Sequence, residues 1–496
     1  MPAETTEDEA SGGIGIVAES RVLIFIAALA SVFITAIEST IVATAMPTIV
    51  AQLGSFELLS WVFTAYLLTQ AVTTPIYGRL SDLYGRKPIL LFGVALFLIG
   101  SALCGFAWNM VSLVLFRIVQ GLGAGAIMPV GRTLIGDVYS GADRARMQGY
   151  VSGVFVAAAV LGPVVGAFLV AHTIWQMVFW INLPLGVLTG AILIWALKER
   201  VGPRPSRIDY GGAALLAVAT FALLFALAQS AVLGVGALAA LILVALVAFV
   251  LFLFQEQRVA EPIWPMSLWR DPMATSGNLA SLALGATMMG VAAYLPVYIQ
   301  GVMGDTALTA GLTLMAMSAS GPVGAVLAGR IMLRASYRAS AGLGAIVYIL
   351  GSVMMSLLAP GSTVYWAMAS GLLMGFGTGM SNNTYMVAIQ SESGWSSRGV
   401  ATSAFMFCRL LGQALGAAAF GGILNAGLAR YLQGGGDLVT RLMNPELRAS
   451  LPPETIAPLM QEFNRSLHIV FVIMVGLAVG VMLVGLKLPK GHGIRR

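Results

Sequence analysis

Three charged residues of this sequence lie inside long apolar runs, where a charge is costly. They are Glu38, Arg117 and Arg409. At the centre of a membrane helix each would cost about 2.5–3.5 kcal/mol, so we expect the three side chains to face a water-filled cavity or to pair within the bundle. Glu38 is the only one of the 21 acidic residues that lies well inside an apolar run. A carboxyl in such a low-dielectric setting can bind and release a proton near neutral pH.

Residues for other kinds of chemistry are missing. The three histidines, His172, His468 and His492, are scattered along the chain, and no cluster of metal ligands is seen. No G-x-x-x-x-G-K-[ST] phosphate-binding loop occurs, so ATP is not the expected energy source. No convergent Ser/His/Asp set is found, and both cysteines, Cys104 and Cys408, lie in apolar runs. We therefore expect no metal, no organic cofactor and no disulfide.

The elements that carry the three charges are predicted to be membrane helices. Hydrophobic residues make up 58% of the 496 residues, charged residues only 10%, and the mean hydropathy is +0.89. A soluble chain could not hide so much apolar surface, so the predicted class is an all-α integral membrane protein. Because a span needs about 20 apolar residues, we predict fourteen spans: 21–45, 58–78, 88–107, 111–133, 147–171, 176–197, 208–229, 234–254, 274–300, 308–330, 339–358, 363–389, 399–427 and 465–487.

The basic residues predict the orientation of the chain. With both termini in the cytoplasm, 21 of the 27 Lys and Arg residues fall in cytoplasmic segments. Three lie in one long outer loop, 428–464, and a fourth, Arg465, lies directly after it. The remaining two, Arg117 and Arg409, are inside spans. This is the positive-inside pattern. Since the net charge of +6 is spread over short loops, the expected partner is a lipid bilayer and not a nucleic acid.

The chain also repeats itself. G-P-x-x-G at 162–166 resembles G-P-x-G at 321–324, although Gly/Ala-rich helices can look alike by chance. We predict two pseudo-symmetric six-helix bundles around two extra central transmembrane helices, an organisation that surrounds a midplane site in many transporters. The predicted divisions are a cytoplasmic tail 1–20, a bundle 21–197, a linker with the extra helices 198–271, a bundle 272–488 and a cytoplasmic tail 489–496.

A charged segment links the second and third spans. Because G-R-L-S-D-L-Y-G-R-K at 78–87 cannot lie in hydrocarbon, we expect a tight turn at the cytoplasmic face, with a glycine at each helix end. It resembles the signature loop of the major facilitator superfamily of secondary transporters. We expect Asp82 to act as a conformational latch that reaches the start of the thirteenth span, near 396–398. The residues of this conformational loop are Gly78, Arg79, Asp82, Gly85, Arg86 and Lys87.

Further motifs resemble those of the fourteen-span drug/proton antiporters in that superfamily. The segment at 37–47 is similar to L-D-x-T-I-V-N-x-A-L-P, with Glu38 in place of Asp and Ala43 in place of Asn. The segment at 117–125 is similar to R-x-x-Q-G-x-G-A-G, and we expect its glycines to serve helix packing. The resemblance implies proton handling for Glu38 and Arg117.

Two more matches lie in the fifth and thirteenth spans. Gly153, Gly162, Pro163 and Gly166 fit the antiporter motif G-x-x-x-x-x-x-x-x-G-P-x-x-G. The family takes this motif as a determinant of antiport, and a helix kink alone is the alternative. Arg409 opens R-x-x-G-x-x-x-G, as in the family, and is expected near the interface of the two halves. We count it with the proton-coupling residues.

The resemblance covers residues 21–488. It implies an exporter of amphiphilic, cationic drugs or toxic compounds in a bacterial inner membrane, driven by the proton gradient and working by alternating access. Met and flat aromatic side chains suit a promiscuous apolar pocket, although ordinary packing explains each of them as well. The candidate substrate-lining residues are Tyr66, Gln70, Gln120, Asn278, Met288, Met289, Tyr294, Asn382 and Phe405.

Other functions stay open at this stage. The first alternative is an exporter of an endogenous lipid or metabolite. The second is a channel or a membrane enzyme. An enzyme would need several polar catalytic residues at one depth. The sequence leaves open the substrate, the proton stoichiometry, the oligomeric state and the use of a periplasmic adaptor protein.

Overall fold

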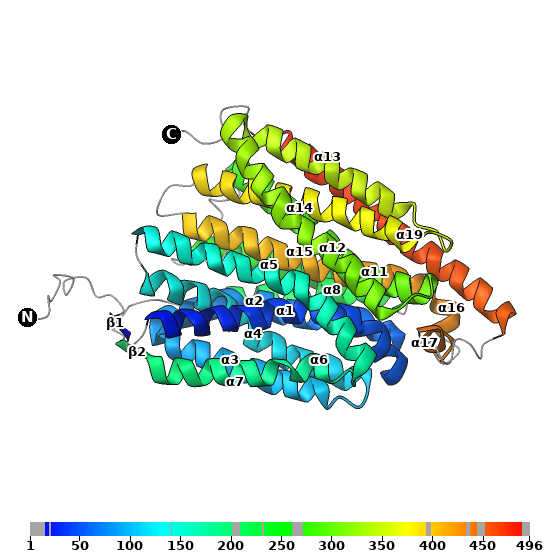
Figure 1. The fold of residues 1–496 in the computed structure, drawn as a ribbon, viewed down its shortest axis with the longest axis horizontal. Helices are drawn as coiled ribbons and strands as arrows, with labels where there is room; N and C mark the ends of the chain where they lie inside the picture. The colour runs from blue at the N-terminus through cyan, green and yellow to red at the C-terminus, as the bar shows by residue number, and fades with distance from the viewer. Residues whose placement is uncertain are drawn as a thin grey trace, which may run out of the picture.

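The protein is a bundle of long helices that run along one common axis (Figure 1). This computed structural model describes residues 15–18, 21–139, 141–200, 209–230, 233–259, 271–392, 398–432, 437–443 and 452–488. The predicted all-α membrane class is confirmed.

The first half of the chain forms one group of helices. Its fourth helix begins at a capping box, in which the Ser112 N–H donates to Asn109 Oδ1 (2.8 Å) and the Asn109 N–H donates to Ser112 Oγ (3.2 Å). Such a cap satisfies two N–H groups that the helix leaves unpaired. The elements are α1 (Arg21–Leu53), η1 (Phe56–Leu58), α2 (Leu59–Tyr84), α3 (Arg86–Gly105), α4 (Met110–Val138), α5 (Gly141–His172), α6 (Met177–Trp180) and α7 (Asn182–Ala196).

Several of the remaining helices begin at side-chain caps. Asp209 caps one of them by accepting a hydrogen bond from the Gly212 N–H (2.8 Å), and Ser336 caps another through the Ala339 N–H (3.1 Å). The elements are α8 (Tyr210–Ala228), α9 (Val235–Arg258), α11 (Pro272–Val297), η2 (Tyr298–Val302), α12 (Ala307–Arg334), α13 (Tyr337–Ser356), α14 (Val364–Glu392), α15 (Arg398–Gly427), α16 (Ala429–Leu432), α17 (Asp437–Met443) and α19 (Pro453–Gly485).

Twelve helices of the described chain are long and apolar enough to cross a membrane. The helices α2 and α14 have a similar length, 26 and 29 residues. Polar residues such as Gln70 and Asn382 lower their hydropathy, and they are not among the twelve. The total of fourteen spans therefore stays a prediction. The helices α8 and α9 coincide with the two extra spans that the sequence predicts.

Two features of the chain differ from the expected outline. A short strand of the N-terminal segment, β1 (Gly15–Ala18), pairs antiparallel with β2 (Leu197–Arg200), so that Gly15 lies opposite Arg200. Four residues without an alternating pattern give no strand signal. In addition, the last span begins earlier than the predicted residue 465, because α19 runs without a break from Pro453 to Gly485.

The predicted turn at 78–87 is also shorter than expected. The helix α2 continues to Tyr84 and α3 begins at Arg86, so the link is a single residue, Gly85, with φ 98°. That backbone conformation is one that glycine adopts without strain. The charged residues of the segment therefore lie on helix ends. Gly78 does not end a helix as expected: it lies inside α2, and a Cβ at that position would meet nothing within 4 Å.

The two halves of the chain touch at one end of the bundle, the end that carries α16 and α17 in Figure 1. Asn425 Nδ2 of α15 donates to the Glu57 carbonyl (2.8 Å), and the rings of Phe56 and Phe463 are 5.6 Å apart. Gly421 of α15 also packs against Ser60 of α2. The opposite end carries β1, β2 and the last turn of α19.

Candidate functional site

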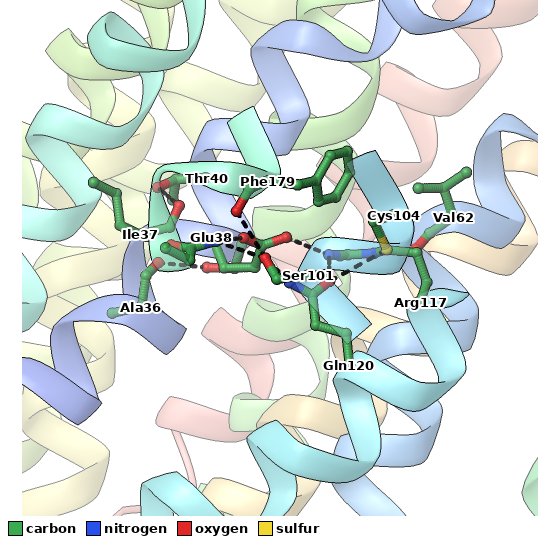
Figure 2. Close-up of polar contacts among 12 residues, drawn as sticks. Ala36, Ile37, Glu38, Thr40, Val62, Ser101, Cys104, Arg117, Gln120 and Phe179 are labelled. Carbon is green, nitrogen blue, oxygen red and sulfur yellow. Dashed lines mark hydrogen bonds and ion pairs between the residues drawn. The ribbon is translucent and has the colours of Figure 1, made fainter. Parts of the chain in front are cut away.

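A buried ion pair lies at the centre of the first group of helices. Glu38 of α1 and Arg117 of α4 are joined by a contact of 2.5 Å between Oε1 and Nη1, and their side chains are 0% and 1% exposed. Figure 2 shows both side chains pointing toward each other across the helices. Of the two arrangements expected for these charges, a water-filled cavity or a pair, the structure shows the pair.

Neutral polar groups complete the pair (Figure 2). Asn182 Nδ2 of α7 donates to Glu38 Oε2 (2.6 Å), so both carboxylate oxygens have partners. Arg117 also donates to Gln120 Oε1 (2.7 Å) and to the Val62 carbonyl (3.1 Å). A fully hydrogen-bonded pair of this kind is tolerated inside a protein, whereas one that has lost a partner is strongly destabilising.

A serine and an aromatic ring hold this network in place. Ser101 Oγ of α3 accepts hydrogen bonds from Gln120 Nε2 and Asn182 Nδ2, both at 3.2 Å, and donates to the Phe179 carbonyl (2.8 Å). The Arg117 guanidinium carbon lies 4.1 Å from the centre of the Tyr66 ring. Cation and ring at this distance attract each other. Two of the predicted substrate-lining residues, Tyr66 and Gln120, are thus part of the ion-pair network.

The sequence of α4 explains how the helices come so close. Gly121 packs against Tyr66 and Thr69 of α2, and Gly123 packs against Phe97 of α3. A side chain at either position would collide with these neighbours, so the small residues allow the approach that brings Tyr66 next to Arg117. The expected packing role of these glycines is confirmed.

The antiporter-motif glycines of α5 pack against the helix that carries Glu38. A Cβ at Gly162 would meet Thr40, and a Cβ at Gly166 would meet Thr44. The carbonyl of Pro163 lies against Gly311 of α12, which belongs to the other half of the chain. The motif therefore connects the ion-pair helix with the interface between the halves. Its first residue takes no part, since Gly153 has nothing within 4 Å of an added Cβ.

The third predicted charge lies elsewhere. Arg409 of α15 donates to Asn382 Oδ1 of α14 (3.3 Å) and to Met288 Sδ of α11 (3.1 Å). We call these three residues the Arg409 cluster. The structure therefore brings together three residues that the sequence singled out for different reasons. It also separates Arg409 from the Glu38–Arg117 pair, with which the sequence grouped it.

The other predicted lining residues lie in the packed interior. Tyr294 donates from its hydroxyl to the Ala417 carbonyl (2.7 Å), and the rings of Tyr294 and Phe405 are fully buried. Met289 and Gln70 are buried as well. Asn278 is buried with neither of its side-chain amide atoms hydrogen-bonded.

The segment at 78–87 ties several elements together at the end of the bundle that carries the strands. Arg86 Nε is paired with Asp137 Oδ2 of α4 (3.0 Å). The carboxylate of Glu199, on β2, accepts hydrogen bonds from the N–H groups of Arg86 and Lys87, both at 2.8 Å. Glu199 thereby caps the start of α3. Lys87 Nζ donates to the carbonyl of Leu197 (2.6 Å).

The latch expected at Asp82 is not tested. The side chains of Arg79 and Asp82, and the whole of residues 396–397, lie outside the described part of the chain.

Sequence reasoning missed three residues of these sites. Asn182 bonds Glu38 directly, Ser101 bonds Asn182 and Gln120, and Glu199 bonds the backbone N–H of Arg86. An amide in an apolar run was the available signal for Asn182, because buried polar groups need partners. Among the described residues, no group of three His, Cys, Asp or Glu side chains could hold a metal.

Comparison of the sequence with known proteins identifies its family. The sequence matches the Major Facilitator Superfamily over residues 28–417. The chain belongs to the major facilitator superfamily. The Multidrug resistance protein 3 of Bacillus subtilis is similar, with 34% identity over 380 residues, which cover 75% of this chain and 73% of that protein. An uncharacterized MFS-type transporter of Mycobacterium tuberculosis is 32% identical over 492 residues, 97% of this chain and 71% of its own.

A solved transporter structure has the same fold. A bacterial homolog of the human lysosomal transporter Spinster superposes with a TM-score of 0.68 at 16% identity and covers 94% of this chain and 97% of its own. The methylenomycin A resistance protein of Streptomyces coelicolor is 30% identical over 419 residues, 80% of this chain and 87% of that protein. The protein is therefore a multi-pass membrane transporter for small molecules, with multidrug-efflux relatives, and not an enzyme.

Proposed function

We propose that this protein exports amphiphilic small molecules across a bacterial inner membrane in exchange for protons, by alternating access. The observation that carries the proposal is the buried Glu38–Arg117 pair with its complete shell of hydrogen bonds. Multidrug-efflux relatives support the direction of transport. The proton gradient is the energy source, with no cofactor.

The proton step follows from the pair. Protonation of Glu38 removes one charge of the pair and leaves Arg117 as a buried cation. Removing one partner of a buried pair costs about 3–5 kcal/mol. Proton binding therefore destabilises this arrangement of the helices and favours another. Release of the proton restores the pair and the starting arrangement.

The route from the proton to the substrate path runs along α1 and α5. Thr40, two residues after Glu38, donates from Oγ1 to the Ala158 carbonyl of α5 (3.3 Å). Gly162 and Gly166 pack on the same side of α1, and Pro163 contacts Gly311 of the other half. A change at Glu38 can therefore shift α5 against α12 and alternately open and close the space between the halves.

The orientation proposed from the Lys and Arg residues fits the arrangement of the ends. The start of α1, the strand pair and the last turn of α19 lie at one end of the bundle (Figure 1). Arg86 and Lys87 lie at that end too, next to Glu199 of β2. With these basic residues in the cytoplasm, both termini are cytoplasmic and the α16–α17 end is periplasmic.

A cationic substrate was expected from the family resemblance, and Glu38 is the deep carboxylate that could bind a cation. In this arrangement both oxygens of Glu38 are hydrogen-bonded and the side chain is fully buried. The amphiphilic character of the substrate does not depend on that carboxylate. Export of an endogenous lipid or metabolite remains the alternative cargo, and the drug susceptibility and lipid profile of a deletion strain separate the two.

The test is dye efflux from proteoliposomes with an imposed pH gradient. Glu38→Gln keeps the shape of the side chain and cannot exchange a proton, so we expect loss of gradient-driven efflux. Arg334→Gln, which removes an exposed charge on the last turn of α12, is the control and should transport normally. Normal coupled efflux by the Glu38 variant would refute the proton-site assignment.

A further inference from the structure

The Arg409 cluster lies well inside the length of α15. Arg409 comes eleven residues after Arg398, where α15 begins, so at 1.5 Å per residue it is about 16 Å along the helix. That is roughly half of the 30 Å hydrocarbon thickness. Arg409, Asn382 and Met288 are all partly exposed there, on three different helices. A charge kept at this depth and still partly exposed points to a polar path through the protein.

The cluster presents hydrogen-bond donors. A guanidinium carries five N–H groups, and those of Arg409 have two side-chain partners, Asn382 Oδ1 and Met288 Sδ. Because the oxygen of Asn382 accepts from Arg409, the NH2 group of Asn382 is the part that can bind a ligand. In the described part of the chain, Arg409 forms no ion pair with a carboxylate. Donors and positive charge suit an oxyanion.

A second arginine of the described chain acts on the cluster. Arg132 of α4, in the other half of the chain, is close enough to act on Arg409 as a like charge. Its guanidinium carbon lies 5.0 Å from the centre of the Phe155 ring. The carboxylate of Glu38 is already neutralised by Arg117. A cationic ligand would therefore meet repulsion between the halves, and an anionic one attraction.

We infer that the Arg409 cluster is the binding site for the oxyanion head group of an amphiphile, a carboxylate, sulfonate or phosphate, whose apolar part lies against Met288. A thioether is a pliable apolar surface that accepts chains and rings of different shape. The inference deepens the proposed function and rests on it, since the bound amphiphile is the exported one. It replaces the cation that the sequence predicted with an anion.

A charge series of ligands tests the inference without relying on a variant. The probes are pyrenebutyrate, its methyl ester and pyrenemethylammonium, and the readout is pyrene fluorescence with the full-length protein in nanodiscs of zwitterionic lipid. We expect the carboxylate to bind at least tenfold more tightly than the ester, and the ammonium compound most weakly. Equal or tighter binding of the ammonium compound overturns the inference.

Variants then locate the site. Arg409→Gln should weaken pyrenebutyrate binding at least tenfold and change binding of the ester less than threefold. Arg409→Lys keeps the charge but not the fork of donors, so its loss should be smaller. Arg334→Gln removes an exposed arginine and should change neither. Unchanged pyrenebutyrate binding by Arg409→Gln overturns the inference, and if that variant does not fold, Arg409→Lys and the charge series decide.

Failure of this inference differs from failure of the proposed function. Binding selectivity is measured without a gradient, whereas the function is tested by gradient-driven efflux of the Glu38→Gln variant. Coupled efflux together with a preference for the ammonium probe would reject the anion site alone. A preference for the anion together with unaltered efflux by Glu38→Gln would reject the proton site alone.

Discussion

The buried pair predicts a double-mutant cycle in which each single change is strongly destabilising and the two effects do not add. Arg117→Met leaves the Glu38 carboxylate with neutral partners such as Asn182, and Glu38→Gln leaves the Arg117 charge with neutral partners such as Gln120. Each single change should destabilise the protein by about 3–5 kcal/mol. The double variant removes both charges, so its cost should be the loss of hydrogen bonds at Gln120 and Val62, about 1–3 kcal/mol.

The coupling energy that follows is at least about 3 kcal/mol, which is at the upper end of values for contacting residues. The assay is the unfolding midpoint of the purified protein in one detergent, followed by circular dichroism, for the four members of the cycle. Arg334→Met, an exposed arginine, controls for the loss of a charge. The double variant should unfold above both single variants. If the two single effects simply add, the pair is not a coupled unit and the reasoning fails.

Three further outcomes can be checked. Gly166→Val should disrupt the contact of α5 with Thr44 and lower the free energy of unfolding by about 1–3 kcal/mol. Gly153→Val, at an open position, should change the unfolding midpoint little. Equal effects of the two changes would contradict the packing argument. Glu199→Gln should weaken the cap on α3 by about 0.5–1 kcal/mol and raise amide hydrogen exchange at Arg86 and Lys87, and unchanged exchange would argue against the cap. Export of a monovalent anion for one proton moves two charges, so an inside-negative potential should add about 4.6 kcal/mol per 100 mV; efflux indifferent to a potassium–valinomycin clamp would contradict the anionic substrate.

The helices were the part of the fold that the sequence predicted best. A run of apolar residues long enough to span a bilayer is a strong local signal, as α9 shows, which spans Val235–Arg258 against the predicted 234–254. The link between α2 and α3 was predicted too long. Helical hydrogen bonding can continue through charged residues at a membrane boundary, and only Gly85 interrupts it.

The partners within the site could be predicted only in part. Polar residues are rare in spans, so Glu38, Arg117 and Arg409 stood out by type and position alone. Their pairing did not, because Glu38 and Arg117 are 79 residues apart and no local pattern relates them. The same holds for Asn182, which lies 144 residues from Glu38. Only the packing of α1, α4 and α7 brings these groups to one point.

The wide separation of the two paired charges has a consequence for how the protein is made. During synthesis α1 enters the membrane before α4 exists, so Glu38 is inserted without Arg117. At about 5–20 residues per second, the 79 residues between them take roughly 4–16 s to follow. The apolar length of α1, 33 residues, must carry that unpaired carboxyl into the bilayer alone. Once Arg117 is inserted, the ion pair favours the association of α1 with α4. Formation of the proton site therefore also contributes to assembly of the bundle.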